Sequence, residues 1–131
     1  MQVLFVEDDA MNRRVVKDML SVVGANMAEA PDAETGLQMI DEGQFSIVLM
    51  DLRMPGMDGL TAIRHLRARG DAKAQLPVIV VTADTALDLR ERCIAQGADE
   101  VLLKPVAMGK LLKAMSQMLA KAAGSNAVVL S

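Results

Sequence analysis

Residues 46–59 read SIVLMDLRMPGMDG, and this stretch decides the fold. Its first five residues form a short apolar run without polar alternation, which is typical of a strand buried on both faces of a parallel sheet. Asp51 ends the run, and the turn residues Pro55 and Gly56 follow it. Gly59 then opens a segment with helical spacing of its apolar residues. The stretch therefore predicts a strand, an aspartate at its carboxyl end, a loop and a helix.

The same order recurs on both sides of this stretch. Apolar runs predict further strands at residues 2–6, 78–81 and 101–103, with a weaker one at 26–29. Periodic patterns predict helices at residues 11–23, 32–43, 59–69, 85–96 and 108–122. Strand then helix, five times over, requires right-handed crossovers. The sequence thus predicts an α/β fold, a (βα)5 doubly wound five-stranded parallel sheet in a flavodoxin-like three-layer sandwich.

The composition is that of one globular domain. The chain has 131 residues, 52% of them hydrophobic and 24% charged, and a formal net charge of -3. We expect the domain to cover residues 1–123 and residues 124–131, which begin Gly-Ser-Asn, to form a flexible tail. The 17 acidic residues outnumber the 14 basic ones, so no nucleic-acid partner is expected. No apolar run is long enough to span a membrane, and the lone Cys93 suits a reducing compartment, so we expect a cytoplasmic protein.

Polar side chains follow four of the predicted strands, and parallel strands bring such residues to one edge of the sheet. Glu7, Asp8 and Asp9 follow the first strand and Asp51 the third. Thr82 follows the fourth strand, and Lys104 with Pro105 follows the fifth. Several carboxylates at one edge would repel each other unless a hard cation lay among them. Mg2+ is such a cation, since it takes a few carboxylates together with water and phosphate oxygens.

These motifs resemble the receiver domains of two-component response regulators, and the match covers residues 3–120. The family has an acidic pair after strand one, here Glu7 and Asp8, and an aspartate after strand three, here Asp51. Met-Pro-Gly-x-Asp-Gly follows at residues 54–59, Thr82 stands after strand four, and Lys-Pro after strand five. The resemblance also implies a cis peptide before Pro105.

The resemblance implies a role for each of these residues. Asp51 is the expected phosphoacceptor, which takes the phosphoryl group from a phosphohistidine. Glu7, Asp8, Asp51 and the carbonyl of Arg53 are the expected Mg2+ ligands. Lys104 should pair with one phosphoryl oxygen and the Thr82 hydroxyl should bind another. The protein would then be a signalling module rather than an enzyme, and Asp9 a bystander or docking residue.

Three positions bear on how such a domain would work. Many receivers carry Tyr or Phe at the position of Val101, where the ring couples to the Thr hydroxyl, so this sequence predicts a different readout. Arg53 and Asp84 stand two residues beyond Asp51 and Thr82. An ion pair between them across the mouth of the site would restrict the water that hydrolyses the acyl phosphate.

The partner and two other functions stay open at this point. A sensor histidine kinase or a histidine phosphotransfer protein is the expected phosphodonor, and the Asn12-Arg13-Arg14 start of the first helix looks like the receivers of hybrid kinases. Receivers commonly meet their donor through this helix, where Met11, Val15 and Val22 widen the apolar face. An aspartyl-nucleophile phosphatase is disfavoured, because in such enzymes the nucleophile follows the first strand. A pseudo-receiver that binds partners without being phosphorylated is the other alternative.

Overall fold

Five parallel strands form a single sheet in the order β2-β1-β3-β4-β5, which confirms the predicted (βα)5 doubly wound architecture. The computed structural model describes the backbone of residues 1–130 and the side chains of residues 1–121. The strands are β1 (Gln2–Val6), β2 (Asn26–Ala30), β3 (Ile47–Asp51), β4 (Val78–Thr82) and β5 (Glu100–Leu103). The helices are α1 (Ala10–Val22), α2 (Ala33–Glu42), α3 (Gly59–Arg67), α4 (Leu89–Gln96) and α5 (Met108–Leu130), with a 3-10 turn η1 (Ala72–Gln75).

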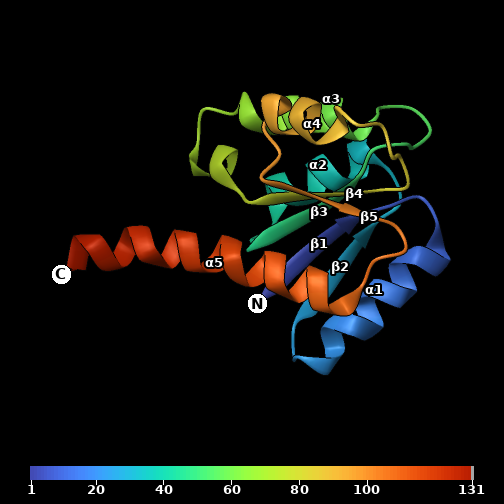
Figure 1. Ribbon diagram of the computed structural model, residues 1–131. Helices are drawn as coiled ribbons and strands as arrows, with labels where there is room; N and C mark the ends of the chain where they lie inside the picture. The colour runs from blue at the N-terminus through green and yellow to red at the C-terminus, as the bar shows by residue number, and fades with distance from the viewer. Residues whose placement is uncertain (131) are drawn as a thin grey trace.

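The sheet lies between two layers of helices. Figure 1 shows α2, α3 and α4 on one face of the sheet and α1 and α5 on the other. Successive strand residues point to opposite faces, so neighbours in one strand belong to different cores. Leu4 of β1 belongs to the same buried cluster as Ile63 of α3, whereas the next residue, Phe5, belongs to the cluster on the other face with Leu111 of α5. All five residues of β3 and of β4 are buried, as their unbroken apolar runs predict.

The strand order creates a crevice at the carboxyl edge of the sheet. β1 pairs with β2 on one side and with β3 on the other, and both pairings are parallel. The connections that leave β1 and β3 therefore pass over opposite faces of the sheet. Ligands of doubly wound folds bind at this switch point, outside the strand ends. The fold thus places the residues that follow β1 and β3 side by side.

Two helix bounds differ from the prediction by more than two residues. α4 begins at Leu89 rather than near residue 85, because the side chain of Asp84 accepts a hydrogen bond from the N–H of Ala86 at 2.9 Å and holds a turn there. α5 continues through Leu130, so the predicted helix end near residue 122 was wrong and the backbone of residues 124–130 is helical. A single glycine lowers helix stability by only about 1 kcal/mol and does not end a helix by itself. Ser131 lies outside the described residues, and a domain boundary at residue 123 stays a prediction.

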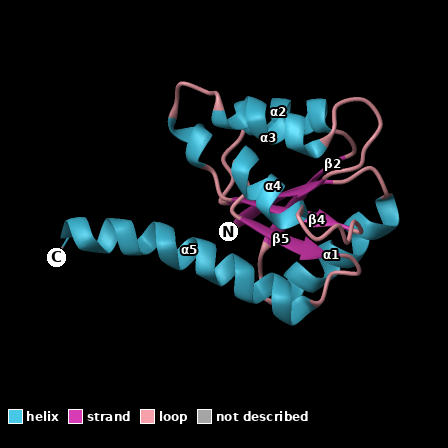
Figure 2. Ribbon diagram, turned by 45° about the horizontal axis from the view of Figure 1, so that its top comes forward, coloured by secondary structure: helices cyan, strands magenta, loops and turns pink. Residues whose placement is uncertain are grey.

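Figure 2 shows α5 running beyond the sheet, with the rest of the helices packed on the strands. None of the described helices combines the length and hydropathy that a bilayer crossing needs.

Candidate functional site

Three carboxylates meet at the carboxyl ends of β1 and β3. Glu7 and Asp8 directly follow β1, and Asp51 is the last residue of β3. Oxygen atoms from all three side chains lie within 4.8 Å of one another. Glu7 and Asp51 are 1% and 4% exposed, whereas Asp8 is exposed to solvent. The structure therefore brings together the three carboxylates that the sequence pointed to.

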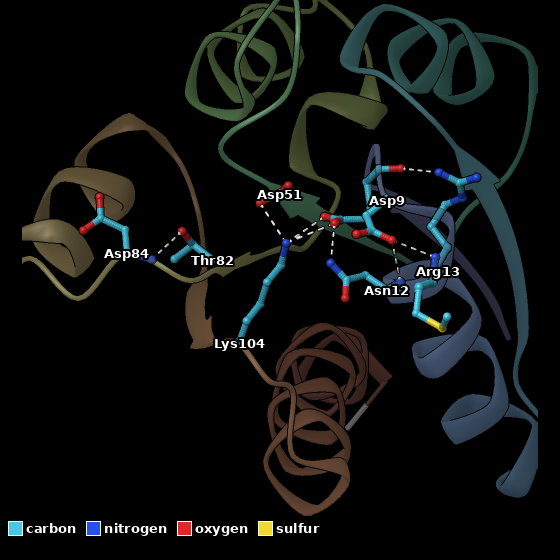
Figure 3. Close-up of polar contacts among 9 residues, drawn as sticks. Asp9, Asn12, Arg13, Asp51, Thr82, Asp84 and Lys104 are labelled. Carbon is cyan, nitrogen blue, oxygen red and sulfur yellow. Dashed lines mark hydrogen bonds and ion pairs between the residues drawn. The ribbon is translucent and has the colours of Figure 1, made fainter.

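Lys104 reaches this cluster from the end of β5. Its Nζ lies 3.0 Å from both carboxylate oxygens of Glu7 and 3.4 Å from Oδ1 of Asp51. Figure 3 shows the extended Lys104 side chain directed at Asp51. The peptide bond between Lys104 and Pro105 is cis, as the resemblance implied. One ammonium thus contacts two buried carboxylates.

The electrostatics of the cluster favour an additional cation. Burial, followed by the adjacent Glu7 carboxyl, raises the pKa of Asp51 to about 6, although Lys104 opposes the change. Burial alone would lower the pKa of Lys104, but its contacts with Glu7 and Asp51 raise it. Three carboxylates facing one ammonium leave excess negative charge in a site that water reaches only partly. Closely spaced carboxylate oxygens of this kind match the ligands that Mg2+ takes in proteins.

The carboxylates border a small cleft of about 240 Å³. Its lining comes from the ends of four strands and the start of α1: Glu7, Asp8, Asp9, Asn12, Asp51, Arg53, Thr82, Ala83 and Lys104. Every residue that the sequence singled out as a site residue therefore borders one cleft. A cleft of this size has room for a few waters or for a phosphoryl group beside a hydrated ion.

Thr82 lines the cleft, and Asp84 lies two residues beyond it in the chain. Thr82 ends β4 and is 1% exposed, and its Oγ1 accepts a hydrogen bond from the N–H of Asp84 at 3.1 Å. Oδ2 of Asp84 lies 3.3 Å from the guanidinium of Arg53, which gives the ion pair predicted across the mouth. The Arg53 side chain is 82% exposed, so this pair adds little to stability. The position of this ion pair at the entrance of the cleft therefore matters more than its contribution to stability.

The loop between β3 and α3 is held against Asp51 by its own residues. Asp58 caps α3 by accepting a hydrogen bond from the N–H of Thr61 at 2.8 Å, and Gly59 donates its N–H to the carbonyl of Leu52 at 3.0 Å. A Cβ on Gly59 would collide with the carbonyl oxygen of Asp51. Gly56 has φ +79°, in the left-handed region that favours glycine. The two glycines thus let the loop pass closely beside the site.

Sequence reasoning missed the part of the site that α1 supplies. Asp9, expected to be a bystander or docking residue, is the N-cap of α1 and accepts hydrogen bonds from the N–H groups of Met11 and Asn12. The side-chain amide of Asn12 donates to Oε1 of Glu7 at 2.8 Å, and the guanidinium of Arg13 donates to the carbonyl of Glu7 at 2.7 Å. An aspartate directly before a helical pattern is a known capping signal. The contacts to Glu7 depend on tertiary structure and leave no such signal.

Comparisons with known proteins agree with this geometry. Residues 3–116 match the model of the response regulator receiver domain family. The sensor histidine kinase RcsC of Salmonella typhi is 36% identical over 116 residues, which are 88% of this chain and 12% of that protein. The chemotaxis protein CheY of Pseudomonas aeruginosa is 37% identical over 106 residues, which are 80% of this chain and 85% of that protein. The chain therefore spans only about an eighth of the kinase.

Solved structures give the same relationship. The receiver domain of sensor histidine kinase PA1611 from Pseudomonas aeruginosa PAO1, solved with a magnesium ion in its active site cleft, superposes with a TM-score of 0.82. It is 28% identical, and the match covers 91% of this chain and 97% of that one. Fold, strand-end residues and sequence similarity lead to one conclusion: the chain belongs to the response regulator receiver domain family.

Proposed function

We propose that this receiver domain accepts a phosphoryl group on Asp51 from a phosphohistidine donor, with Mg2+ bound by Glu7, Asp8, Asp51 and the carbonyl of Arg53. The observation that carries the proposal is the grouping of three carboxylates within 4.8 Å beside a lysine that reaches Asp51. Bound Mg2+ would neutralise charge on the phosphoryl oxygens and so favour transfer. The magnesium ion in the PA1611 receiver supports the choice of metal.

The chain's own residues would carry the transfer as follows. An oxygen of the Asp51 carboxylate attacks phosphorus, the phosphorus–nitrogen bond of the phosphohistidine breaks, and the imidazole nitrogen leaves with the electron pair and takes up a proton. Lys104, 3.4 Å from Oδ1 of Asp51, is placed to donate to a phosphoryl oxygen. The hydroxyl of Thr82 would donate to another. Positioning and charge neutralisation suffice, because phosphoryl transfer needs little covalent chemistry from the protein.

The readout would pass through Thr82 rather than through an aromatic ring. Val101 lies in β5, half-buried against the core beneath α4, and offers no hydroxyl and little area to move. Thr82 already contacts the backbone of Asp84, and Asp84 holds the turn before α4. A Thr82 hydroxyl that turns toward a phosphoryl group would therefore act first on this turn. We therefore propose that the phosphorylated receiver signals through a conformational change of the segment before α4.

We expect the phosphodonor to be a sensor histidine kinase or a histidine phosphotransfer protein, and the receiver to be linked to a hybrid kinase in the full-length chain. We expect the module to act in the cytoplasm, without nucleic acid or membrane. On α1, Met11, Val15 and Val22 are 70%, 45% and 72% exposed, an apolar surface suited to a helical partner. RcsC and PA1611 are themselves sensor histidine kinases, which supports this class of partner.

Mass spectrometry of the whole protein tests the acceptor residue. Incubation with Mg2+ and phosphoramidate, whose phosphorus–nitrogen bond mimics phosphohistidine, should add the mass of one phosphoryl group, in a form stable to acid and labile to base. Asp51→Asn should abolish the gain. Asp9→Asn is the matched control, because Asp9 lies at the same edge outside the carboxylate cluster and asparagine also caps helices. Equal labelling of Asp51→Asn, or no labelling of the wild type, would refute the proposal.

A further inference from the structure

Glu7 is held at both of its ends by the first turn of α1. Its carboxylate is 1% exposed and accepts a hydrogen bond from the side-chain amide of Asn12 at 2.8 Å. Its backbone carbonyl accepts a hydrogen bond from the guanidinium of Arg13 at 2.7 Å. The same Arg13 forms an ion pair with Glu29 at 3.1 Å, which ties α1 to β2. The position of Glu7 therefore depends on the register of α1.

The other partner of the Glu7 carboxylate has a second task. Lys104 contacts both oxygens of Glu7 at 3.0 Å, but under the proposed function it must also serve a phosphoryl group on Asp51. When Lys104 turns to that group, Asn12 is the remaining described side chain that donates a hydrogen bond to the Glu7 carboxylate. A buried carboxylate without hydrogen-bond partners is costly in free energy. The hydrogen bond from Asn12 therefore becomes more important for Glu7 once Lys104 has turned away.

The chemical nature of Asn12 suits this task. An ionised carboxylate only accepts hydrogen bonds, so the amide nitrogen must be the atom that faces Glu7. Unlike Lys104, the amide carries no net charge, and it therefore fixes the carboxylate while reducing its attraction for a cation less than an ammonium would. Asn12 is itself held, because its backbone N–H donates to the capping oxygen of Asp9 at 3.3 Å. Residues that orient metal ligands in this way strongly affect metal affinity.

We propose that Asn12 is a positioning residue that holds the Glu7 carboxylate for Mg2+ while Lys104 serves the phosphoryl group. The inference rests on the proposed function, since it takes Glu7 as a metal ligand. It adds that the start of α1, outside the strand-end residues, sets the affinity of the site for Mg2+.

Two substitutions separate the hydrogen bond from packing. Asn12→Leu keeps most of the side-chain volume and removes the donor, and Asn12→Ala removes both. In each variant the Kd for Mg2+, measured by NMR titration without a phosphodonor, should rise by about tenfold. Met11→Ala, in the same turn with a side chain that is 70% exposed, is the matched control and should leave the Kd unchanged. In a Glu7→Ala background, either Asn12 substitution should have no further effect.

A second readout needs no metal. In the metal-free wild type, the side-chain amide signals of Asn12 should shift when Glu7 is replaced by alanine, since their acceptor is lost. Unmoved signals would overturn the inference. So would a wild-type Kd in Asn12→Leu, which would assign any effect of Asn12→Ala to packing. A wild-type protein that binds no Mg2+ would refute the proposed function and the inference together, whereas wild-type binding with unaffected Asn12 variants refutes the inference alone.

Discussion

Asp51→Asn should stabilise the metal-free protein at neutral pH, because the fold holds an ionised carboxylate in a poor environment. Burial and the Glu7 carboxyl raise the pKa of Asp51 from its ordinary 3.8 to about 6. Because its pKa is higher in the folded state, Asp51 makes its most favourable contribution to the free energy of unfolding below about pH 4. That contribution is lost as the pH rises through about 6. At about 1.4 kcal/mol for each pH unit, ionised Asp51 costs the fold about 3 kcal/mol at about pH 7.5.

The pH dependence gives the prediction its test. The Asp51 side chain is only 6% exposed, so solvent screens little of the effect. Asparagine stays neutral and resembles the protonated acid, so the variant should gain about 3 kcal/mol at about pH 7.5 and about 1 kcal/mol at about pH 4.5. The comparison with wild type at each pH cancels the titration of the other carboxylates.

Urea unfolding followed by circular dichroism, with EDTA present, measures the two free energies of unfolding. Intrinsic fluorescence is a poor probe here because the chain has no Trp and no Tyr. Asp9→Asn is the control and should show no such pH-dependent gain. An Asp51→Asn variant that is no more stable than wild type at about pH 7.5, or that gains equally at both pH values, would refute the reasoning.

Further predictions concern the loop, the cap, the entrance and the metal. Gly59→Ala should lower the free energy of unfolding by about 1–3 kcal/mol, because its Cβ would collide with the carbonyl of Asp51, and an unchanged urea midpoint would contradict this. Asp9→Ala should cost about 1 kcal/mol by removing the cap of α1, and Asp9→Asn should restore most of it in the same assay. Arg53→Ala and Asp84→Ala should each shorten the lifetime of the phosphorylated protein a few fold, measured by mass spectrometry over time, and equal lifetimes would remove the ion pair from the mechanism. The affinity for Mg2+ should fall as the pH drops below about 6, since protons compete for Asp51, and an NMR titration with constant affinity across that range would contradict it.

The fold was predictable because four of the five strands contain short apolar runs. The apolar run before Asp51 has no polar alternation, and the structure buries every residue of β3. The helix bounds were predictable where a capping residue marks them, as Asp32 marks α2. They were wrong where a side chain redirected the backbone, as Asp84 does before α4, or where a glycine looked like a helix end near residue 124.

The candidate site was predictable for a different reason. Parallel strands end at one edge, so residues that follow them in the sequence must come close in space. That rule brings Asp51, Lys104 and Thr82 together without knowledge of any side-chain geometry. Contacts that cross from a helix to the site, such as that of Asn12 with Glu7, depend on helix register and rotamer and could not be found in this way.

The contact between Lys104 and Glu7 joins residues 97 positions apart, close to the full span of the sheet. Closing so long a loop has an entropic cost that only the completed sheet offsets, because β5 docks on β4 and not on β1. Contacts between residues this far apart in the sequence form late and reduce the rate of folding. A chain in which β5 has not docked therefore lacks the ammonium that lies beside Asp51 in the folded protein. Under the proposed function, a chain without a docked β5 would lack the lysine that contacts the phosphoryl group on Asp51, so the site is complete only when the last strand of the sheet is in place.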